Sequence, residues 1–315
     1  MKTRLLVNEN TMGQIDAYLA KKNPGGLILY GEEHLGKSHL AEEIARILLC
    51  TSRHGSGACD KCDSCMKALD AHPDYMKVVP DGACIKVEQM REAINFSKYN
   101  CVVSCRKVIV IDGAETLSED AQDIILKLLE DGNDSNVVIF VTSKKLLPTV
   151  HSRCSMIQVM HVINENQDNR LSSMLAIGRP GLVKILEEDS AFLDTMKAYI
   201  TMLSQIKNKR EIMEVLGVIK EKDKKNFYEG SSFDEVCVLF NFHENLFETL
   251  LNRMYGVQED VYGLERFMKF DCLMHLYSEE TLLNLLALTV EHKELYRNQK
   301  YNKNDFFSYL QRVVG

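Results

Sequence analysis

The sequence predicts an α/β domain followed by a small helical domain and a C-terminal helical domain. Between residues 27 and 159, short apolar runs alternate with segments of helical period, and a glycine-rich loop follows the first run. Strand signals stop after about residue 163, and at 315 residues the chain exceeds a typical single domain. We therefore expect domains at residues 1–163, 164–219 and 220–315.

The expected strands are short and almost wholly apolar, which is typical of a parallel sheet with helical crossovers. Residues 38–49 place apolar side chains at helical spacing, and Ser118 can cap a second helix. Beyond about residue 220 apolar positions again repeat at helical spacing, which predicts a bundle of helices. The strands are expected at residues 27–30, 75–79, 107–111, 137–141 and 156–159.

Composition and charge argue against several classes of protein. The chain is 45% hydrophobic and 26% charged, as folded globular proteins are. No apolar run reaches the ~18 residues that cross a bilayer, and the N-terminus lacks the apolar core and cleavage site of a secretion signal. We therefore expect a cytoplasmic protein without a membrane partner. The net charge of −7 also disfavours strong DNA binding by the chain alone.

Residues 31–38 read Gly-Glu-Glu-His-Leu-Gly-Lys-Ser and fit the phosphate-binding P-loop pattern. The loop follows an expected strand and opens an amphipathic helix, as this chemistry requires. Gly31 and Gly36 allow the tight turn that directs N–H groups at phosphate. Lys37 would reach the terminal phosphates, and the Ser38 hydroxyl can ligate magnesium. We expect a site for ATP or ADP with Mg²⁺; the alternative is a glycine-rich turn that fits by chance.

An acidic residue follows a wholly apolar strand. The run Val-Ile-Val-Ile at residues 108–111 leads into Asp112, as in Walker B strands, which hold magnesium at the carboxyl edge of a sheet. The next residue is Gly113, where hydrolytic ATPases with this motif usually place a glutamate that polarises water. Hydrolysis by this chain is therefore expected to be slow or absent. In the alternative, Glu115 turns inward and acts as the base.

Four of the ten cysteines lie within a 16-residue segment and have the spacing C-x8-C-x2-C-x2-C. Four thiolates suit one tetrahedral zinc ion, and a complete sulfur shell leaves no open position for catalysis. We expect a structural zinc that fastens an insert, residues 50–65, onto the sheet. The alternatives are free thiols or a redox pair, and a site in which His54 replaces Cys50. The expected ligands are Cys50, Cys59, Cys62 and Cys65.

Arg153 lies in the segment between the fourth and fifth expected strands, where it is well placed to project from the edge of the domain. A guanidinium there can stabilise charge on a phosphate held by a neighbouring subunit. From chemistry alone, a loop arginine is more often a solvated surface charge. The functional interpretation therefore depends on the motifs that accompany it.

Together these motifs resemble the bacterial clamp-loader subunits of DNA polymerase III, which are AAA+ proteins. The resemblance covers about residues 25–185, and the remainder is similar in architecture only. Residues 72–75 (His-Pro-Asp-Tyr) and Gly113 are more similar to the delta-prime branch than to the gamma/tau motor, where glutamate follows the acid. The segments concerned are the P-loop, the four-cysteine insert and residues 72–75, 111–118, 126–130 and 147–154.

The resemblance implies an AAA+ α/β domain with a zinc insert, a small helical lid and an all-α collar. It implies assembly with gamma/tau and delta subunits into a hetero-pentamer, which uses ATP to load the sliding clamp onto primer-template DNA. It also implies that Arg153 acts in trans on a neighbour's ATP, and that Thr142 is the polar sensor of the terminal phosphate. The alternative is a gamma/tau-like ATPase motor, which Lys37, Ser38 and Asp112 favour.

Two departures from the family pattern bear on hydrolysis. Gly181 stands about where active relatives carry a second sensor arginine, with Arg179 as the alternative at that place. Many delta-prime relatives have lost the P-loop, whereas this chain keeps it, so we expect a nucleotide that binds without turnover and stiffens the domain. A third class, a zinc-dependent nucleic-acid-binding module, is disfavoured because few basic residues surround the cysteines.

Overall fold

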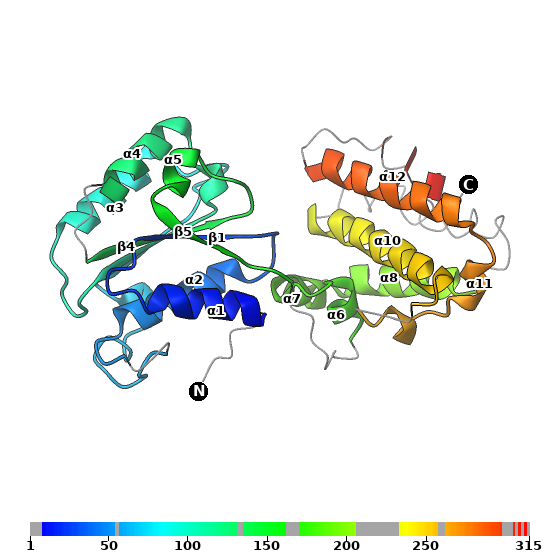
Figure 1. Ribbon diagram of the computed structural model, residues 1–315, viewed down its shortest axis with the longest axis horizontal. Coiled ribbons are helices and arrows are strands. Elements are labelled where there is room, and N and C mark those ends of the chain that lie inside the picture. The colour runs from blue at the N-terminus through cyan, green and yellow to red at the C-terminus, as the bar shows by residue number, and fades with distance from the viewer. Residues whose placement is uncertain are drawn as a thin grey trace. The chain divides into compact units, whose positions relative to one another are not determined.

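The chain forms two compact units, Met1–Val162 and Ile163–Gly315, each with its own hydrophobic core (Figure 1). The computed structural model describes residues 8–53, 57–130, 135–161, 170–205, 233–257 and 262–297, and from the C-terminal segment residues 305, 308, 309, 312 and 313. Among these residues no helix has both the length and the apolar character that a bilayer crossing requires.

The first unit is built on a five-stranded parallel sheet with the order β2-β3-β4-β1-β5. Because β1 lies between β4 and β5, the chain leaves β1 for the far edge of the sheet before it returns. In open α/β sheets ligands bind at the carboxyl ends of strands near such a reversal. The strands are β1 (Gly26–Tyr30), β2 (Tyr75–Val78), β3 (Lys107–Asp112), β4 (Asn136–Thr142) and β5 (Cys154–Gln158).

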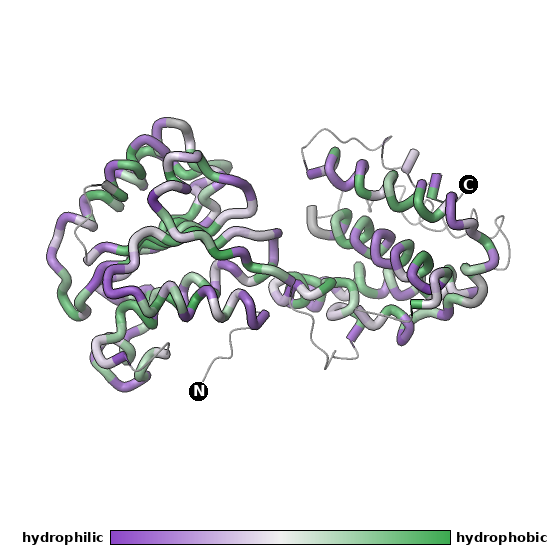
Figure 2. Tube along the Cα trace, in the orientation of Figure 1, coloured by the Kyte–Doolittle hydropathy of each residue, from purple (hydrophilic) through white to green (hydrophobic). Residues whose placement is uncertain are grey.

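Helices cover both faces of this sheet (Figure 1). Side chains alternate along each strand, so Leu27 and Leu29 belong to the core under α1 and α2, whereas Ile28 belongs to the core under α3 and α4. The strands are accordingly hydrophobic along most of their length (Figure 2). The helices are α1 (Glu9–Leu19), α2 (Lys37–Leu49), α3 (Val87–Lys98), α4 (Glu119–Glu130) and α5 (Pro148–His151), with short turns η1 (Leu69–Ala71) and η2 (Ala114–Thr116).

In the described part of the second unit, all regular elements are helical. Its apolar core includes a buried polar group: His243 lies between the hydroxyls of Tyr199, 2.8 Å from Nε2, and Tyr309, 2.7 Å from Nδ1. Burial lowers the pKa of His243 to about 3, so the ring is neutral. The elements are α6 (Leu171–Leu175), α7 (Pro180–Glu188), α8 (Ser190–Leu203), α10 (Phe233–Met254), η3 (Leu264–Arg266), α11 (Asp271–Met274) and α12 (Glu279–Arg297).

The predicted α/β architecture is confirmed for the first unit. Each expected strand coincides with an observed one to within two residues at either end. Ser118 caps α4 as expected, because its Oγ accepts the N–H of Ala121 at 3.3 Å. The division of the second unit into a lid and a collar stays a prediction, since residues 219 and 220 lie outside the described residues, as does His54.

Candidate nucleotide and metal sites

The P-loop connects β1 to α2 at the carboxyl edge of the sheet. Gly36 precedes α2 with φ 80° and ψ 19°, and His34 also has a positive φ, 62°, which is unusual for a residue with a side chain. A Cβ at Gly31 would lie 2.3 Å from the carbonyl oxygen of Val159, so only glycine fits there. The P-loop glycine at position 31 therefore has a steric reason in this fold.

Lys37 begins α2 and folds back over the loop. Its Nζ donates to the carbonyl oxygen of Gly31 at 2.9 Å and to that of Glu32. The residue is only 7% exposed. Burial lowers the pKa of Lys37, and nearby carboxylates, of which Glu115 has the largest effect, oppose this. The amine thus lies inside the loop, where the phosphates of a nucleotide would meet it.

Asp112, at the end of β3, is contacted on both carboxylate oxygens. Its Oδ1 accepts a hydrogen bond from Ser38 Oγ at 2.8 Å, which brings together the two residues predicted to hold magnesium. Its Oδ2 lies 3.3 Å from Nζ of Lys77 on β2. The same Nζ donates to Glu42 Oε1 on α2 at 2.8 Å. A hydroxyl and a carboxylate are ligands that suit Mg²⁺, so the residues present fit that ion.

Lys77 and Glu42 were missed by the sequence analysis. The one signal in the sequence is a lysine inside an otherwise apolar strand, and this signal does not show which residues contact that lysine. Burial alone would lower the pKa of Lys77, but the hydrogen bond to Glu42 and the charge of Asp112 raise it above its ordinary value. Lys77 is therefore a permanent cation beside the acid of β3.

In the described residues 113–117, directly after Asp112, the one carboxylate is Glu115, and it is already hydrogen-bonded. Gly113 has φ 77°, and a Cβ there would lie 3.1 Å from Cγ of Pro80. Both oxygens of Glu115 bind Ser143: Oε1 accepts from the hydroxyl at 2.7 Å and Oε2 from the N–H at 3.2 Å. For Glu115 to act as the base, these two hydrogen bonds would have to break.

Thr142 and Arg153 make local contacts. Thr142, 1% exposed at the end of β4, donates through Oγ1 to the carbonyl of Lys144 at 2.7 Å and accepts its N–H at 3.1 Å. The exposed Arg153 donates through Nη1 to the carbonyl of Thr149 at 3.0 Å. Arg179 is buried directly before α7. The sensor roles of Thr142 and Arg179 and the trans role of Arg153 stay predictions.

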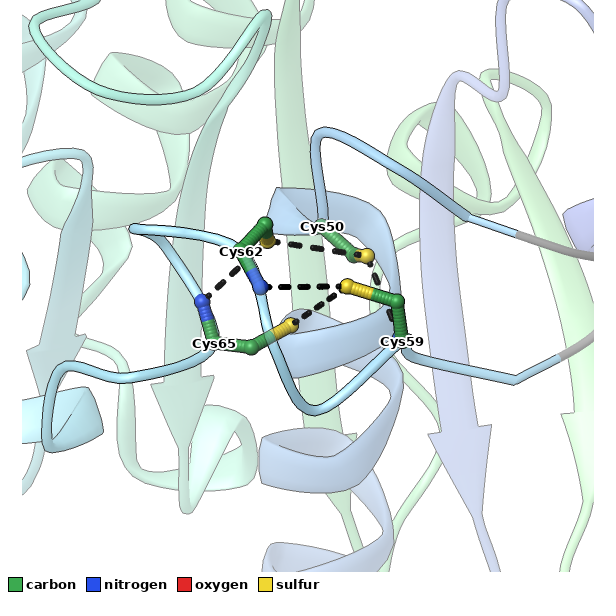
Figure 3. A group of neighbouring side chains, drawn as sticks. All are labelled: Cys50, Cys59, Cys62 and Cys65. Carbon is green, nitrogen blue, oxygen red and sulfur yellow. Dashed lines mark hydrogen bonds between the residues drawn. The ribbon is translucent and has the colours of Figure 1, made fainter.

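The four cysteines converge at the other end of α2 (Figure 3). Their Sγ atoms all lie within 4.8 Å of one another, and the Cys50–Cys62 and Cys59–Cys65 pairs are each 3.9 Å apart. Zinc–sulfur bonds of about 2.3 Å in a tetrahedron require sulfurs about 3.8 Å apart. The arrangement therefore fits one tetrahedral metal ion.

Hydrogen bonds to sulfur organise the cluster. Backbone N–H groups of Cys59, Cys62 and Cys65 donate to Sγ of Cys50, Cys59 and Cys62, at 3.3, 3.3 and 3.4 Å respectively. Burial would raise the pKa of Cys62, but hydrogen bonds from Thr51 and from the Cys65 N–H lower it to about 5. Cys62 thus favours the thiolate, the form of cysteine that binds metal, whereas burial raises the pKa of Cys50 and raises that of Cys65 to about 12.

A buried chain of hydrogen bonds connects the insert to the sheet. Nδ1 of His72 accepts the N–H of Asp74 at 3.1 Å, so Nε2 carries the ring proton and donates to Ser64 Oγ at 2.9 Å. Ser64 in turn donates to the carbonyl of Leu49, the last residue of α2, at 2.8 Å. Burial of His72 lowers its pKa, which keeps this tautomer neutral.

Asp74 extends this chain to the loop before β3. Its fully buried carboxylate accepts the N–H groups of Val102, Val103 and Ser104 at 2.7, 2.8 and 2.8 Å. Burial would raise the pKa of Asp74, but these bonds outweigh it and lower the pKa. The His-Pro-Asp-Tyr segment, noted only for its resemblance, therefore joins the insert, β2 and this loop.

Comparison with known proteins finds relatives among DNA polymerase III subunits. The chain is 36% identical to subunit delta' of Pseudomonas aeruginosa, over 40% of this chain and 40% of that protein. It is 26% identical to subunit delta' of Haemophilus influenzae, over 60% and 63%. It is 23% identical to subunit gamma/tau of Mycoplasma genitalium, over 97% and 53%. The chain thus spans about half the length of these relatives.

The parallel sheet, the loop with the P-loop sequence pattern after β1 and the acid ending β3 define the first unit as an α/β domain of the P-loop type. Residues 8–162, nearly all of this unit, match the family described as DNA polymerase III, delta subunit. With two delta' subunits among the relatives, this part of the chain belongs to the DNA polymerase III delta-prime family.

Proposed function

We propose that this chain is a delta-prime-like subunit of the DNA polymerase III clamp loader, which assists ATP-driven loading of the sliding clamp onto primer-template DNA. It would assemble in the cytoplasm with gamma/tau and delta subunits into a hetero-pentamer, with residues 220–315 as the collar. The family of the first unit supports this role.

The surroundings of Asp112 carry the proposal that this subunit binds ATP or ADP with Mg²⁺ but does not hydrolyse ATP. Lys37 lies inside the P-loop, and Ser38 and Asp112 meet where magnesium would be held. The residue after Asp112 is a glycine in the left-handed conformation, and Glu115 is bound to Ser143. The site therefore has groups that hold a triphosphate and lacks a positioned base.

The catalytic contribution of this chain would be made in trans. Arg153 is exposed in the segment between α5 and β5, and its guanidinium donates through Nη1 to the carbonyl of Thr149. A guanidinium inserted beside a neighbour's terminal phosphate stabilises the charge that develops during phosphoryl transfer. Thr142 would contact the phosphate held by this chain itself.

One experiment tests the non-hydrolysing role, and it needs only the isolated chain. Steady-state ATPase should not exceed that of Lys37→Ala, while nucleotide binding should be lost in that variant. Turnover by the native chain well above this control would reject the proposal.

A second experiment tests the trans role in the reconstituted complex. Arg153→Ala should leave the complex assembled and reduce its DNA-stimulated ATPase by about tenfold or more. Arg91→Ala, which removes another exposed arginine from the same unit, is the matched control. Unchanged turnover with Arg153→Ala would reject the trans role.

A gamma/tau-like ATPase motor is the second candidate. The match to a gamma/tau subunit spans 97% of this chain, more than the matches to the two delta' subunits. The retained Lys37, Ser38 and Asp112 also favour it. Brisk DNA-stimulated ATPase by the lone chain would support this candidate.

The cysteine cluster would hold a structural zinc ion through Cys50, Cys59, Cys62 and Cys65. The sulfur spacing suits a closed tetrahedral shell, which leaves no position for a substrate. The ion would fasten the insert between the end of α2 and β2.

A further inference from the structure

Lys77 forms an ion pair with Asp112, the acidic residue that ends β3. Nζ of Lys77 lies 3.3 Å from Asp112 Oδ2, on the carboxylate whose other oxygen accepts from Ser38 at 2.8 Å. Oε1 of Glu42 accepts a hydrogen bond from the same Nζ at 2.8 Å. Lys77 is therefore fixed between two carboxylates at the place where a magnesium-bound nucleotide would be bound.

Chain topology fixes this arrangement. Lys77 pairs with Val110 in the parallel register of β2 and β3, so Lys77, Val110 and Asp112 face the same side of the sheet. That side is covered by α2, which supplies both Ser38 and Glu42. The contact is thus set by the sheet and its covering helix, not by a loop.

The contact is partly shielded from solvent. The side chains of Lys77 and Asp112 are 26% and 20% exposed. A pair in this setting is screened less than a fully exposed ion pair. The positive charge of Lys77 therefore acts on any ion or phosphate group that binds beside Asp112.

A fixed ammonium beside Asp112 makes the binding of a divalent ion at that carboxylate less favourable. Magnesium at the Ser38 and Asp112 oxygens would meet a carboxylate that is partly neutralised, because Asp112 shares the ammonium with Glu42, and would be repelled by the ammonium a few ångströms away. The ammonium also supplies positive charge near the terminal phosphates, which is one of the tasks of the metal ion. Both effects reduce the benefit of Mg²⁺ to nucleotide binding.

We propose that Lys77 is an internal counterion that takes over part of the charge of magnesium, so that the P-loop of this chain binds nucleotide with little dependence on Mg²⁺. This inference rests on the proposed nucleotide site. It adds a second reason for absent hydrolysis, because a metal ion held weakly at Asp112 is poorly placed to polarise the terminal phosphate.

The test measures the affinity of the full chain for a fluorescent ADP analogue in excess EDTA and in millimolar Mg²⁺. For the native chain the two dissociation constants should agree within about threefold. Lys77→Met should bind at least about tenfold more tightly with Mg²⁺ than with EDTA. Lys77→Arg, which keeps the charge, should behave as the native chain does.

Lys77→Gln is the second variant, because it removes the charge but keeps a hydrogen-bond donor for Glu42; zinc content and thermal unfolding check that each variant folds. Strong Mg²⁺ dependence in the native chain that neither Lys77→Met nor Lys77→Gln alters would overturn the inference while leaving the nucleotide site intact. If neither the native chain nor any variant binds the analogue in either buffer, both this inference and the proposed nucleotide site are rejected. The trans role of Arg153 is tested separately, by the ATPase of the reconstituted complex.

Discussion

Helix α2 has a different kind of candidate site at each end. Side chains at the N-terminal end make internal contacts that a ligand would replace, whereas the cysteines at the C-terminal end are connected to a buried hydrogen-bond network. Its 13 residues span about 20 Å. At the N-terminal end, Lys37 and Ser38 bind groups of the chain itself, contacts that a nucleotide would exchange for its phosphates and metal. At the C-terminal end, the sulfurs lie at metal-binding spacing and are tied into the sheet by Ser64, His72 and Asp74.

The comparison shows where ligand binding and folding are coupled in this domain. Groups that bind a ligand by exchanging internal contacts change affinity when mutated but leave the fold in place. Groups that are part of a buried network change the stability of the domain itself. We call the C-terminal end of α2 the cysteine end and its N-terminal end the phosphate end. We therefore expect variants at the cysteine end to have a lower free energy of unfolding and variants at the phosphate end to bind nucleotide less tightly.

Removal of one thiolate should have the largest effect. In Cys62→Ser we expect zinc content to fall well below one per chain and the free energy of unfolding to drop by about 3–5 kcal/mol. This is less than the ~10–16 kcal/mol of zinc-finger peptides, because the sheet has a core of its own. Elemental analysis and urea unfolding measure the two quantities. The exposed Cys105→Ser should change neither, and an equal response of both variants would contradict a metal role.

Asp74→Asn should follow in size. The variant replaces a fully buried carboxylate by an amide that can accept at only one oxygen, which leaves at least one of the three N–H groups of residues 102–104 without an acceptor. We expect a loss of about 3 kcal/mol in urea unfolding at neutral pH. Asp70→Asn, at an exposed position, should cost almost nothing.

The pH dependence of that loss follows from the lowered pKa of Asp74. The stabilisation is fully present above the unfolded-state value of about 4 and is lost as pH falls through the lower folded-state value. The difference between the native chain and Asp74→Asn should therefore be constant above about pH 5 and shrink below about pH 4. A difference that grows on acidification would contradict the assignment.

Sequence reasoning found the features that are local in the chain. The P-loop and the four cysteines each lie within a short segment, and the apolar runs that form the strands are visible as runs. The partners of these groups are not local. Ser38 and Asp112 are 74 residues apart, Lys77 and Glu42 are 35 apart, and Glu115 and Ser143 are 28 apart.

Which acid meets which cation depends on strand order and register, and the sequence does not specify either uniquely. Asp112 was expected to serve magnesium, and its contact with Lys77 emerged only once β2 lay beside β3. The contact of His72 was likewise not predictable from the sequence. His72 was noted only as part of a resemblance, and in the structure its ring is hydrogen-bonded to Ser64 in a different loop.

At the phosphate end, Lys37→Met should separate ligand binding from stability. Its amine lies within the loop and is 7% exposed. We expect nucleotide affinity to fall about 100-fold, or ~2.7 kcal/mol, because the charge that meets the phosphates is gone. Zinc content should not change, and the free energy of unfolding without nucleotide should move by less than ~1 kcal/mol, since a methionine avoids burying a charge. A large loss of stability would show that this end is also part of the folding core.

Gly113→Ala should give the smallest effect and tests why no glutamate follows Asp112. Gly113 and Gly82 have nearly the same backbone angle, φ 77° and 76°, but a Cβ meets Pro80 at 3.1 Å at position 113 and nothing within 4 Å at position 82. Both alanine variants carry the left-handed penalty of ~1 kcal/mol, so their difference isolates the contact with Pro80. We expect Gly113→Ala to be less stable than Gly82→Ala by about 0.5–1 kcal/mol in urea unfolding. Equal stability would mean that the turn after β3 accepts a side chain, and the missing base would then have no steric cause.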